Sequence, residues 1–401
     1  MKKLIIIIFN LYFINSFSQT QNKVLHHNNL EYNLMLIGVS DSTSNIILYD
    51  NNHRDNNVQW VVSKIVKYIS DKRNVNYFVE QNAEDIEMYK YFRENDSIVL
   101  AYNYFWNFCR VSEDNVQDEF EQKLRGGKIN LFGYDCTTFN EITIRSIIDS
   151  TKKEFLKKGI ERFELLDSVE SLLYLAPSLN MVLSTISPSE YKQFYNVYEI
   201  VMNNVSSALK KRWENMRHFF YWTSSRGILF PEPGKKITAK EHDLWYSYRE
   251  WRIYQNFLEL FQNIEKRTNI IAIGGGHSAR HGIKYKHIRN EELSPSISDY
   301  FNKNGRSNYH RILITNPEDV DFQDSKKFLN IQEVFIDSIK VDIITPRDRN
   351  KRKSIFFKLE RFSNYIDKIE ANWFESFDYI IVINKMKSPE NIYTEVHSII
   401  Y

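Results

Sequence analysis

Short apolar segments alternate with amphipathic helices through the first half of the chain, and this alternation constrains the fold more than any other feature of the sequence. Apolar side chains recur at helical spacing between residues 58 and 69, and further helices are predicted at residues 83–92 and from about Glu141. The predicted strands are residues 34–38, 75–79, 129–134, 269–273, 310–314, 334–344 and 379–383. Such alternation is typical of βαβ units, so we expect an α/β fold whose mainly parallel sheet is flanked by helices.

A long helical region interrupts this pattern from about residue 150 to residue 267. Its three predicted helices are charged and rich in Tyr, Phe and Trp, and they cover residues 152–173, 188–222 and 239–267. A Pro-Glu-Pro-Gly cluster at residues 231–234 separates the last two, and predicted strands return after them. We therefore interpret the region as a helical insertion or cap on the α/β core and not as an independent domain.

The amino terminus has the pattern of a secretory signal peptide. A positively charged start runs into the apolar residues 4–9, and small residues precede a predicted cleavage after Ser18. A retained anchor helix would need about 20 apolar residues, and asparagines interrupt this run. We expect a signal peptide at residues 1–18 and a mature domain at residues 19–401, exported to a bacterial periplasm or out of the cell and without a membrane span.

The charge balance indicates which partners to expect. The 53 lysine and arginine residues face 51 aspartate and glutamate residues, which leaves a formal net charge of +2. A nucleic-acid groove normally leaves a basic footprint, and this balance shows none. We therefore expect a small-molecule ligand or substrate and no nucleic acid.

The two cysteines, Cys109 and Cys136, both lie in the predicted mature chain. Export would permit a disulfide between them, and two buried free thiols are the alternative. Two cysteines cannot form a zinc cluster by themselves, and the sequence contains no Cys-x-x-Cys motif. The cysteines therefore identify no metal site.

The most distinctive segment at the end of a predicted strand is residues 274–282. In open parallel sheets, ligands bind at the carboxyl ends of strands. Here Gly275 and Gly276 allow close approach of a ligand to the backbone and leave amide groups for an anion. His277 and His281 follow, four residues apart, a spacing that suits a metal or an acid–base pair if a helix begins there. A tight turn with incidental histidines is the alternative.

Two carboxylates also follow predicted strands. Glu80 ends the apolar run at residues 75–79, and Asp135 ends the run at residues 129–134. Helix capping is the alternative role for both. A glutamate that met His277 at the sheet edge would give general-base activation of water. The sequence does not indicate a serine hydrolase, because it contains no Gly-x-Ser-x-Gly nucleophile elbow.

The order of these motifs resembles the erythromycin-esterase-like family, part of a wider superfamily with Tiki/TraB and ChaN-like haem-uptake proteins. The resemblance spans most of the predicted mature chain. The matching segments are residues 36–45, 77–80, 132–135, 212–216, 271–277 and 377–383. The resemblance implies an esterase-like hydrolase in which Glu80, Asp135 and His277 are catalytic. It also implies that Arg212 binds an anion and that no cofactor is required.

The first motif departs from the family pattern. The family has a Gly-Glu-x-His type motif there. This chain has Val39 in place of the Glu, and Asp41, or Ser42 if the gap is one residue longer, in place of the His. Valine cannot hold a proton, bind a metal or position water. Asp41 could substitute in part as a catalytic carboxylate, or His53 could approach from the polar loop at residues 50–57.

Three functions therefore stay open. The first is a hydrolase with altered chemistry, in which Glu80 is the general base. The second is a non-catalytic protein that binds a ligand, a metal or a haem, for which His277 or His281 would be the axial ligand. The third is an exported interaction protein that uses the aromatic segment at residues 245–251, although helix–helix packing also explains that segment.

Overall fold

The computed structural model describes the chain in several segments. These are residues 39, 44–50, 56–95, 114–136, 139–175, 186–229, 239–274, 297, 300–301, 309–315, 326–327, 329–336, 339–347, 357–359, 369–371 and 377–383. Within these segments, no helix combines the length and the apolar character that a membrane span requires. The predicted signal peptide and the predicted strand at residues 34–38 lie outside them.

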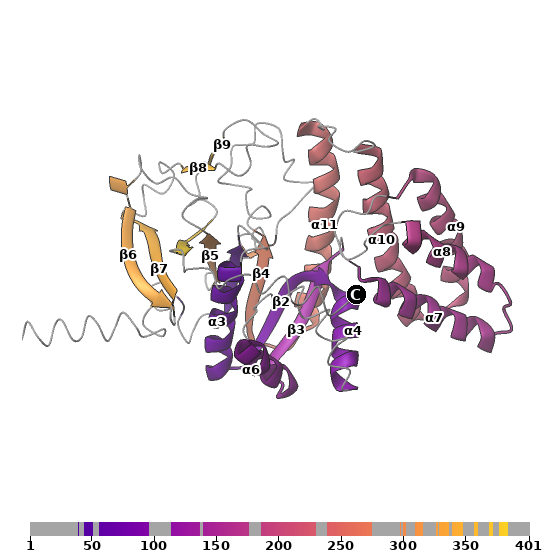
Figure 1. The fold of residues 1–401 in the computed structure, drawn as a ribbon, viewed down its shortest axis with the longest axis horizontal. Coiled ribbons are helices and arrows are strands. Elements are labelled where there is room, and N and C mark those ends of the chain that lie inside the picture. The colour runs from indigo at the N-terminus through magenta and orange to yellow at the C-terminus, as the bar shows by residue number, and fades with distance from the viewer. Residues whose placement is uncertain are drawn as a thin grey trace, which may run out of the picture.

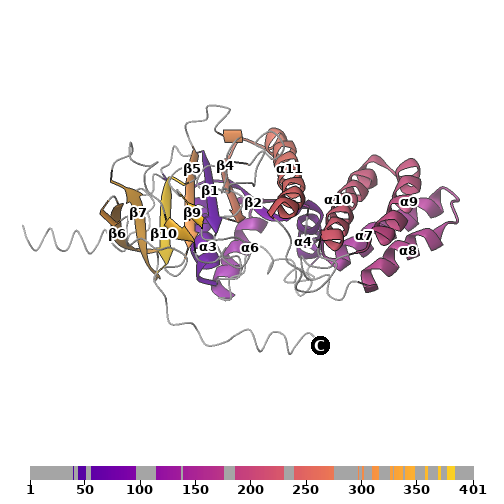
Figure 2. The ribbon, with the colours of Figure 1, turned by 90° about the horizontal axis from the view of Figure 1, so that it is seen from above.

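The core of the fold is an eight-stranded sheet with the strand order β3-β2-β4-β1-β5-β10-β7-β6 (Figures 1 and 2). The strands are β1 (Asn45–Asp50), β2 (Val75–Asn82), β3 (Ile129–Asp135), β4 (Thr268–Gly274), β5 (Tyr309–Thr315), β6 (Leu329–Ile336), β7 (Ile339–Pro346) and β10 (Tyr379–Ile383). All pairs from β3 to β10 are parallel. β7 is antiparallel to β10 and β6 is antiparallel to β7. The predicted mainly parallel α/β sheet is therefore confirmed.

The described helices and a small hairpin complete the structure. The helices are α3 (Asn56–Lys72), α4 (Ala83–Glu94), α6 (Asp114–Arg125), α7 (Glu141–Lys157), α8 (Phe163–Leu175), α9 (Pro188–Asn204), α10 (Ser207–Leu229) and α11 (Ala239–Asn263). β8 (Phe357–Leu359) and β9 (Ile369–Ala371) form a separate antiparallel pair. In both views α7–α10 lie at one end of the molecule and β6 and β7 lie at the other (Figures 1 and 2). α7–α10 thus form the predicted helical cap, whereas α11, which the prediction also placed in the cap, packs against the sheet.

Two hydrophobic cores lie on opposite faces of the sheet. In β1, Ile46 and Leu48 pack into the core that holds side chains of α3, α4 and α6. Ile47 and Tyr49, which alternate with them, pack into the core that holds side chains of α11. Successive strand residues point to opposite faces, so β1 is buried on both sides, as expected for the interior of a parallel sheet.

The region from residue 45 to residue 57 differs from the prediction. The sequence predicts a strand at residues 34–38, which lies outside the described residues, and a polar loop at residues 50–57, but no strand at residues 45–50. The structure adds β1, which ends at Asp50, and α3 begins at Asn56, so β1, α3 and β2 form one βαβ unit. The apolar run in β1 is short and is flanked by Ser, Asn and Asp, so the sequence pattern does not identify it as a strand.

Three predicted elements are also divided in the structure. The helix predicted at residues 152–173 is interrupted after Lys158, because Gly159 has a φ of 68°. There the Ile160 N–H donates to Phe155 O at 2.9 Å and the Gly159 N–H donates to Leu156 O at 3.1 Å, which is a Schellman end. The helix predicted at 188–222 is divided into α9 and α10, and the strand predicted at 334–344 is the β6–β7 hairpin.

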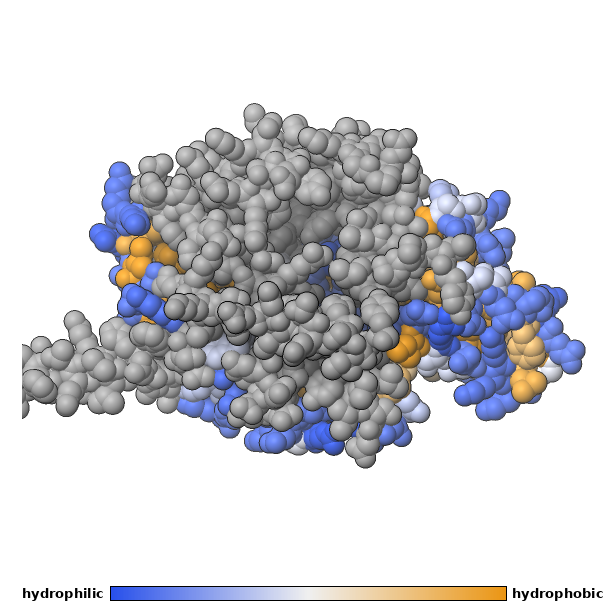
Figure 3. Space-filling model, viewed as in Figure 1, coloured by the Kyte–Doolittle hydropathy of each residue, from blue (hydrophilic) through white to orange (hydrophobic). Residues whose placement is uncertain are grey.

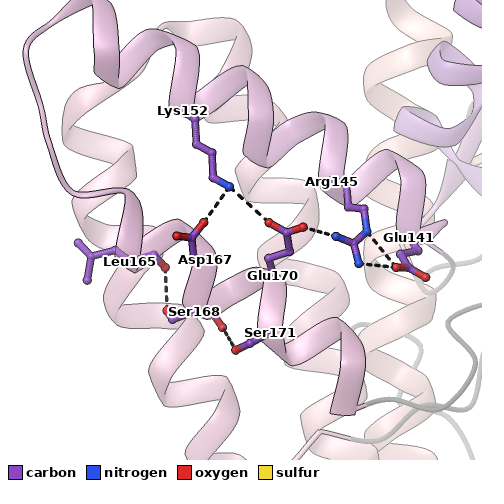
Figure 4. Close-up of polar contacts among 8 residues, drawn as sticks. All are labelled: Glu141, Arg145, Lys152, Leu165, Asp167, Ser168, Glu170 and Ser171. Carbon is purple, nitrogen blue, oxygen red and sulfur yellow. Dashed lines mark hydrogen bonds and ion pairs between the residues drawn. The ribbon is translucent and has the colours of Figure 1, made fainter.

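Ion pairs join α7 to α8 on the surface of the cap (Figure 4). Arg145 binds Glu141 at 2.7 Å and also pairs with Glu170 of α8. Lys152 binds Asp167 at 2.8 Å and Glu170 at 3.4 Å. On the face seen in Figure 3, the described part of the cap is mainly hydrophilic, with small hydrophobic patches. Beneath this surface, α7–α10 share a third hydrophobic core around Trp213 and Phe194.

Candidate functional site

Three strands of the sheet end in or near a carboxylate. Asp50 is the last residue of β1, Asp135 is the last residue of β3, and Glu80 lies two residues before the end of β2. These strands run in the same direction, so their carboxyl ends share one edge of the sheet. β4 lies between β2 and β1 and ends at Gly274, which pairs with Asp50 in the register. This edge is where ligands bind in open α/β sheets.

A β-bulge positions Glu80. The register of β2 and β3 runs from Val79 opposite Gly133 to Asn82 opposite Asp135, so two residues of β2 face one of β3. A Cβ atom on Gly133 would lie 2.6 Å from Gln81 O and 2.7 Å from Asn82 O, so only glycine permits this close approach. Bulges of this kind re-aim side chains next to active sites.

Arg249 of α11 joins two of the carboxylates. Its Nη2 lies 2.6 Å from Glu80 Oε1 and 2.9 Å from Asp135 Oδ2. The second oxygen of Glu80 accepts a hydrogen bond of 2.8 Å from the Gly274 N–H. The side chains of Arg249, Glu80 and Asp135 are 14%, 12% and 1% exposed. We call these three residues the carboxylate–arginine site.

Tyr134 and Asp50 adjoin this site. The Tyr134 hydroxyl donates to Ala272 O at 2.6 Å. Burial first, and then the charges of Glu80, Asp135 and Asp50, raise the pKa of Tyr134 well above its ordinary value, so this phenol keeps its proton. Asp50 accepts a hydrogen bond of 2.9 Å from Gln59 Nε2 of α3.

The chemistry of this edge follows from its charges. Asp50, Glu80 and Asp135 bring three carboxylates to the edge, and Arg249 supplies one positive charge to two of them. The hydrogen bonds from Gly274 and Arg249 fix the Glu80 carboxylate, which suits a group that must accept a proton from a positioned water. Among the described residues, no group of three or more His, Cys, Asp or Glu side chains is arranged to hold a metal ion.

The predicted site residues divide into three sets. Glu80 and Asp135 are brought together through Arg249. Arg212 instead forms an ion pair with Glu84 of α4 at 2.8 Å, and Asn215 donates to the other Glu84 oxygen at 3.1 Å. The remaining predicted residues lie outside the described residues, and their roles stay predictions: Asp41, Gly275, Gly276, His277 and His281.

Two residues of this edge were missed by the sequence analysis. Asp50 follows the apolar run of β1, and the runs before Glu80 and Asp135 have the same form, so this shared pattern could have identified it. Arg249 comes from a helix 114 residues after Asp135, and no local pattern distinguishes it. Val39, which the resemblance placed at a catalytic position, is 5% exposed and belongs to the core beside α3.

Cys136 directly follows the site. It is a buried free thiol, so the disulfide alternative is not realised at this residue, and Cys109 lies outside the described residues. The Cys136 N–H donates to Asp135 Oδ1 at 2.6 Å. It is this backbone N–H that helps to orient Asp135. Burial, and then the charge of Asp135, raise the pKa of the thiol well above its ordinary value, so the Cys136 side chain stays protonated.

Known structures show what this arrangement is similar to. No protein-family model matches the chain, and no curated protein matches it by sequence. A single-residue variant of the erythromycin esterase EreC, in its open conformation, aligns over 90% of this chain and 96% of its own, with a TM-score of 0.53 and 11% identity. A Bacillus cereus protein aligns over 88% of this chain and 91% of its own, with a TM-score of 0.51 and 14% identity.

A third structure extends the comparison. ChaN of Campylobacter jejuni, solved with cofacial haem, aligns over 88% of this chain and 90% of its own at 9% identity. Its TM-score of 0.27 is too low to support an argument. The support for a common fold thus comes from the two better matches, which cover nearly the whole chain. The chain has an erythromycin-esterase-like fold.

Proposed function

We propose that this chain is an exported hydrolase that cleaves an ester or lactone bond in a small molecule at the carboxyl edge of the sheet. The observation that carries the proposal is the carboxylate–arginine site itself, because Arg249 joins Glu80 and Asp135 at the ends of neighbouring parallel strands. Export rests on the signal-peptide pattern of residues 1–18. The similarity to an esterase supports the reaction class as an analogy of fold.

In this proposal Glu80 acts as the general base. The Gly274 N–H and Arg249 hold its carboxylate in one orientation, and its side chain is 12% exposed. Glu80 takes a proton from a water molecule as the water oxygen attacks the carbonyl carbon. Asp135 orients Arg249, and His277, which follows β4 in the sequence, polarises the substrate.

A panel of aryl esters, alkyl esters and lactones tests the proposal. We expect Glu80→Gln to lower kcat by at least about 10²-fold, because the amide cannot accept the proton. The matched control is Glu87→Gln, which makes the same change on a 65% exposed side chain of α4. Thermal unfolding of both variants confirms that they fold.

Two outcomes would contradict the proposal. The first is hydrolysis by Glu80→Gln at the rate of the unmodified protein. The second is the absence of turnover across the panel together with saturable binding of one of the compounds. That result would favour a non-catalytic ligand-binding protein at the same edge.

A further inference from the structure

Arg252 of α11 differs from the arginines around it, because its guanidinium pairs with no carboxylate of the described residues. Arg212, Arg217 and Arg249 each bind a glutamate, at 2.8, 2.5 and 2.6 Å. In the same part of the structure, Arg252 makes one long hydrogen bond, from Nη2 to Asn215 Oδ1 at 3.4 Å. Its Nε is buried and has no hydrogen-bond partner. A guanidinium carries five N–H donors, so most of the binding capacity of this group is unused.

The carboxylate that lies next along this contact is already bound. Glu84, in the first turn of α4, accepts from Arg212 Nε at 2.8 Å through Oε2 and from Asn215 Nδ2 at 3.1 Å through Oε1. Asn215 then accepts from Arg252 through Oδ1, so the four side chains form a row that ends at Arg252. Two cations and one anion make up this row. One positive charge of the row is therefore left without a counter-ion.

The position of Arg252 on α11 brings it to the carboxyl edge of the sheet. Arg249, Arg252 and Asn256 are three and four residues apart, so they lie on one face of the helix. The outer two contact the end of β3: Arg249 Nη2 lies 2.9 Å from Asp135 Oδ2, and Asn256 Nδ2 donates to Tyr134 O at 3.0 Å. Arg252 is thus one turn from Arg249, about 4.5 Å along the helix axis.

The electrostatics of Cys136, which follows β3, agree with this position. Burial, and then the charge of Asp135, raise the pKa of the thiol, and the charges of Arg249 and Arg252 both lower it in part. The Arg252 side chain is partly exposed, so a solute can reach the guanidinium. A buried donor of a charged group is costly to leave unpaired, and native proteins satisfy such groups with a bound ion, ligand or water. Water would satisfy the donor but would not compensate the charge.

We propose that Arg252 binds an oxyanion, a carboxylate or a phosphate group, of the molecule that the carboxylate–arginine site hydrolyses. The planar guanidinium presents paired N–H donors that match two oxygens of such a group, and the anion supplies the missing counter-charge. Asn215 positions the guanidinium through its Oδ1. The substrate is then an acidic ester or lactone, and this assignment rests on the hydrolytic function proposed above. The anion site itself does not depend on turnover.

Binding of inorganic phosphate tests the site without a substrate. We expect phosphate to raise the unfolding temperature more than chloride of equal ionic strength, because a ligand of the folded state stabilises it. Arg252→Gln should weaken the apparent phosphate affinity by at least about 10-fold. Arg252→Lys keeps the charge without the fork and should weaken it less, and it gives the comparison if Arg252→Gln does not fold. The matched control is Arg145→Gln, which removes an arginine that already pairs with two glutamates.

Kinetics with paired esters test whether the site serves the substrate. Aryl monoesters of linear dicarboxylic acids of increasing length are compared with aryl esters of the matching monocarboxylic acids. We expect kcat/KM for the best acidic ester to exceed that of its neutral partner by at least about 10-fold, mainly through KM. Arg252→Gln should abolish this preference, and Arg145→Gln should retain it. Esters that carry a phosphate in place of the second carboxylate show which oxyanion is preferred.

The outcomes separate this inference from the function on which it rests. If Glu80→Gln loses turnover while Arg252→Gln keeps the preference for acidic esters and the phosphate affinity, the anion site alone is overturned. Equal kcat/KM for acidic and neutral esters in the unmodified protein overturns the assignment of the anion to the substrate. Phosphate binding that depends on Arg252, in a protein that hydrolyses no ester, overturns the proposed reaction and supports the anion site.

Discussion

Two arginines in this molecule each bind two carboxylates, and they differ in burial. Arg249 joins Glu80 and Asp135 with all three side chains at most 14% exposed. Arg145 joins Glu141 and Glu170 on the cap, where the side chains are 26–44% exposed (Figure 4). The ionic groups are alike, so the comparison isolates the effect of the surroundings. Water screens the exposed pairs, whereas removing the arginine of the buried set leaves two carboxylates side by side where water screens them poorly.

The largest expected effect follows from removing the buried cation. Arg249→Met leaves Glu80 and Asp135 facing each other at the sheet edge, and we expect the free energy of unfolding to fall by about 3–5 kcal/mol. Chemical denaturation measures this loss. Adding Glu80→Gln and Asp135→Asn removes the repelling charges and should restore most of the stability. A triple variant as unstable as Arg249→Met would show that the arginine stem, not its charge, is what matters.

A buried carboxyl group without an arginine bridge sharpens the comparison. Asp85 of α4 accepts hydrogen bonds from the Asn140 N–H at 3.1 Å and from Thr143 Oγ1 at 2.6 Å, which ties α4 to the start of α7. Burial outweighs these bonds and raises the pKa of Asp85 from 3.8 to about 7. Between pH 3.8 and about pH 7, Asp85 holds a proton in the folded protein that it has lost in the unfolded chain. The contribution of this proton to the free energy of unfolding is therefore complete below pH 3.8 and is lost as the pH rises through 7.

We expect the stability to fall by about 1.4 kcal/mol per pH unit across that interval on account of Asp85. Asp85→Asn cannot ionise, so its unfolding free energy should be flatter from pH 4 to pH 7. Denaturant unfolding at several pH values measures the difference between the two proteins. Parallel curves would show that Asp85 ionises without a cost and that hydrogen bonds alone compensate its burial.

The parts of the site that sequence reasoning identified are those marked by local patterns. β2 and β3 are apolar runs that are each followed by a predicted helix, so Glu80 and Asp135 could be placed at their ends from the sequence. β1 is also a short apolar run that ends in a carboxylate. The apolar run at residues 34–38 is stronger, however, so the sequence predicts the first strand there and not at β1. The local signal of a short buried strand is weak, because periodicity cannot distinguish it from other apolar runs.

The parts that could not be identified depend on contacts between distant segments. Arg249 is one of 53 cationic side chains, and it meets Glu80 across 169 residues. Arg252 and Asn215 meet across the interface of two helices, 37 residues apart. Only the packing of α10 against α11 and of α11 against β3 brings these groups together, and no motif records that packing.

A smaller effect on the free energy of unfolding is expected from disturbing the β-bulge that positions Glu80. In Gly133→Ala the added methyl group would lie within 2.8 Å of two backbone oxygens and Ile86 Cγ1, so the bulge that carries Glu80 must shift. We expect a loss of about 1–3 kcal/mol in unfolding free energy, together with a weaker Arg249–Glu80 contact. The control is Gly126→Ala, where the closest atom is 3.2 Å away. Equal losses in both variants would show that the close approach is not specific to the site.

The smallest effect is expected from the exposed arginine. In Arg145→Met, Glu141 becomes solvated, because its side chain is already 44% exposed, and Glu170 keeps its contact with Lys152. Neither carboxylate has to be buried without a partner, so we expect a change below about 1 kcal/mol in unfolding free energy. Measuring Arg145→Met beside Arg249→Met, in low and high salt, makes the test direct. The difference between the two arginines should persist when salt screens the surface, since burial and not the number of ion pairs causes it. If Arg145→Met lost as much stability as Arg249→Met, burial would not be the cause, and the orienting role assigned to Arg249 would have no energetic basis.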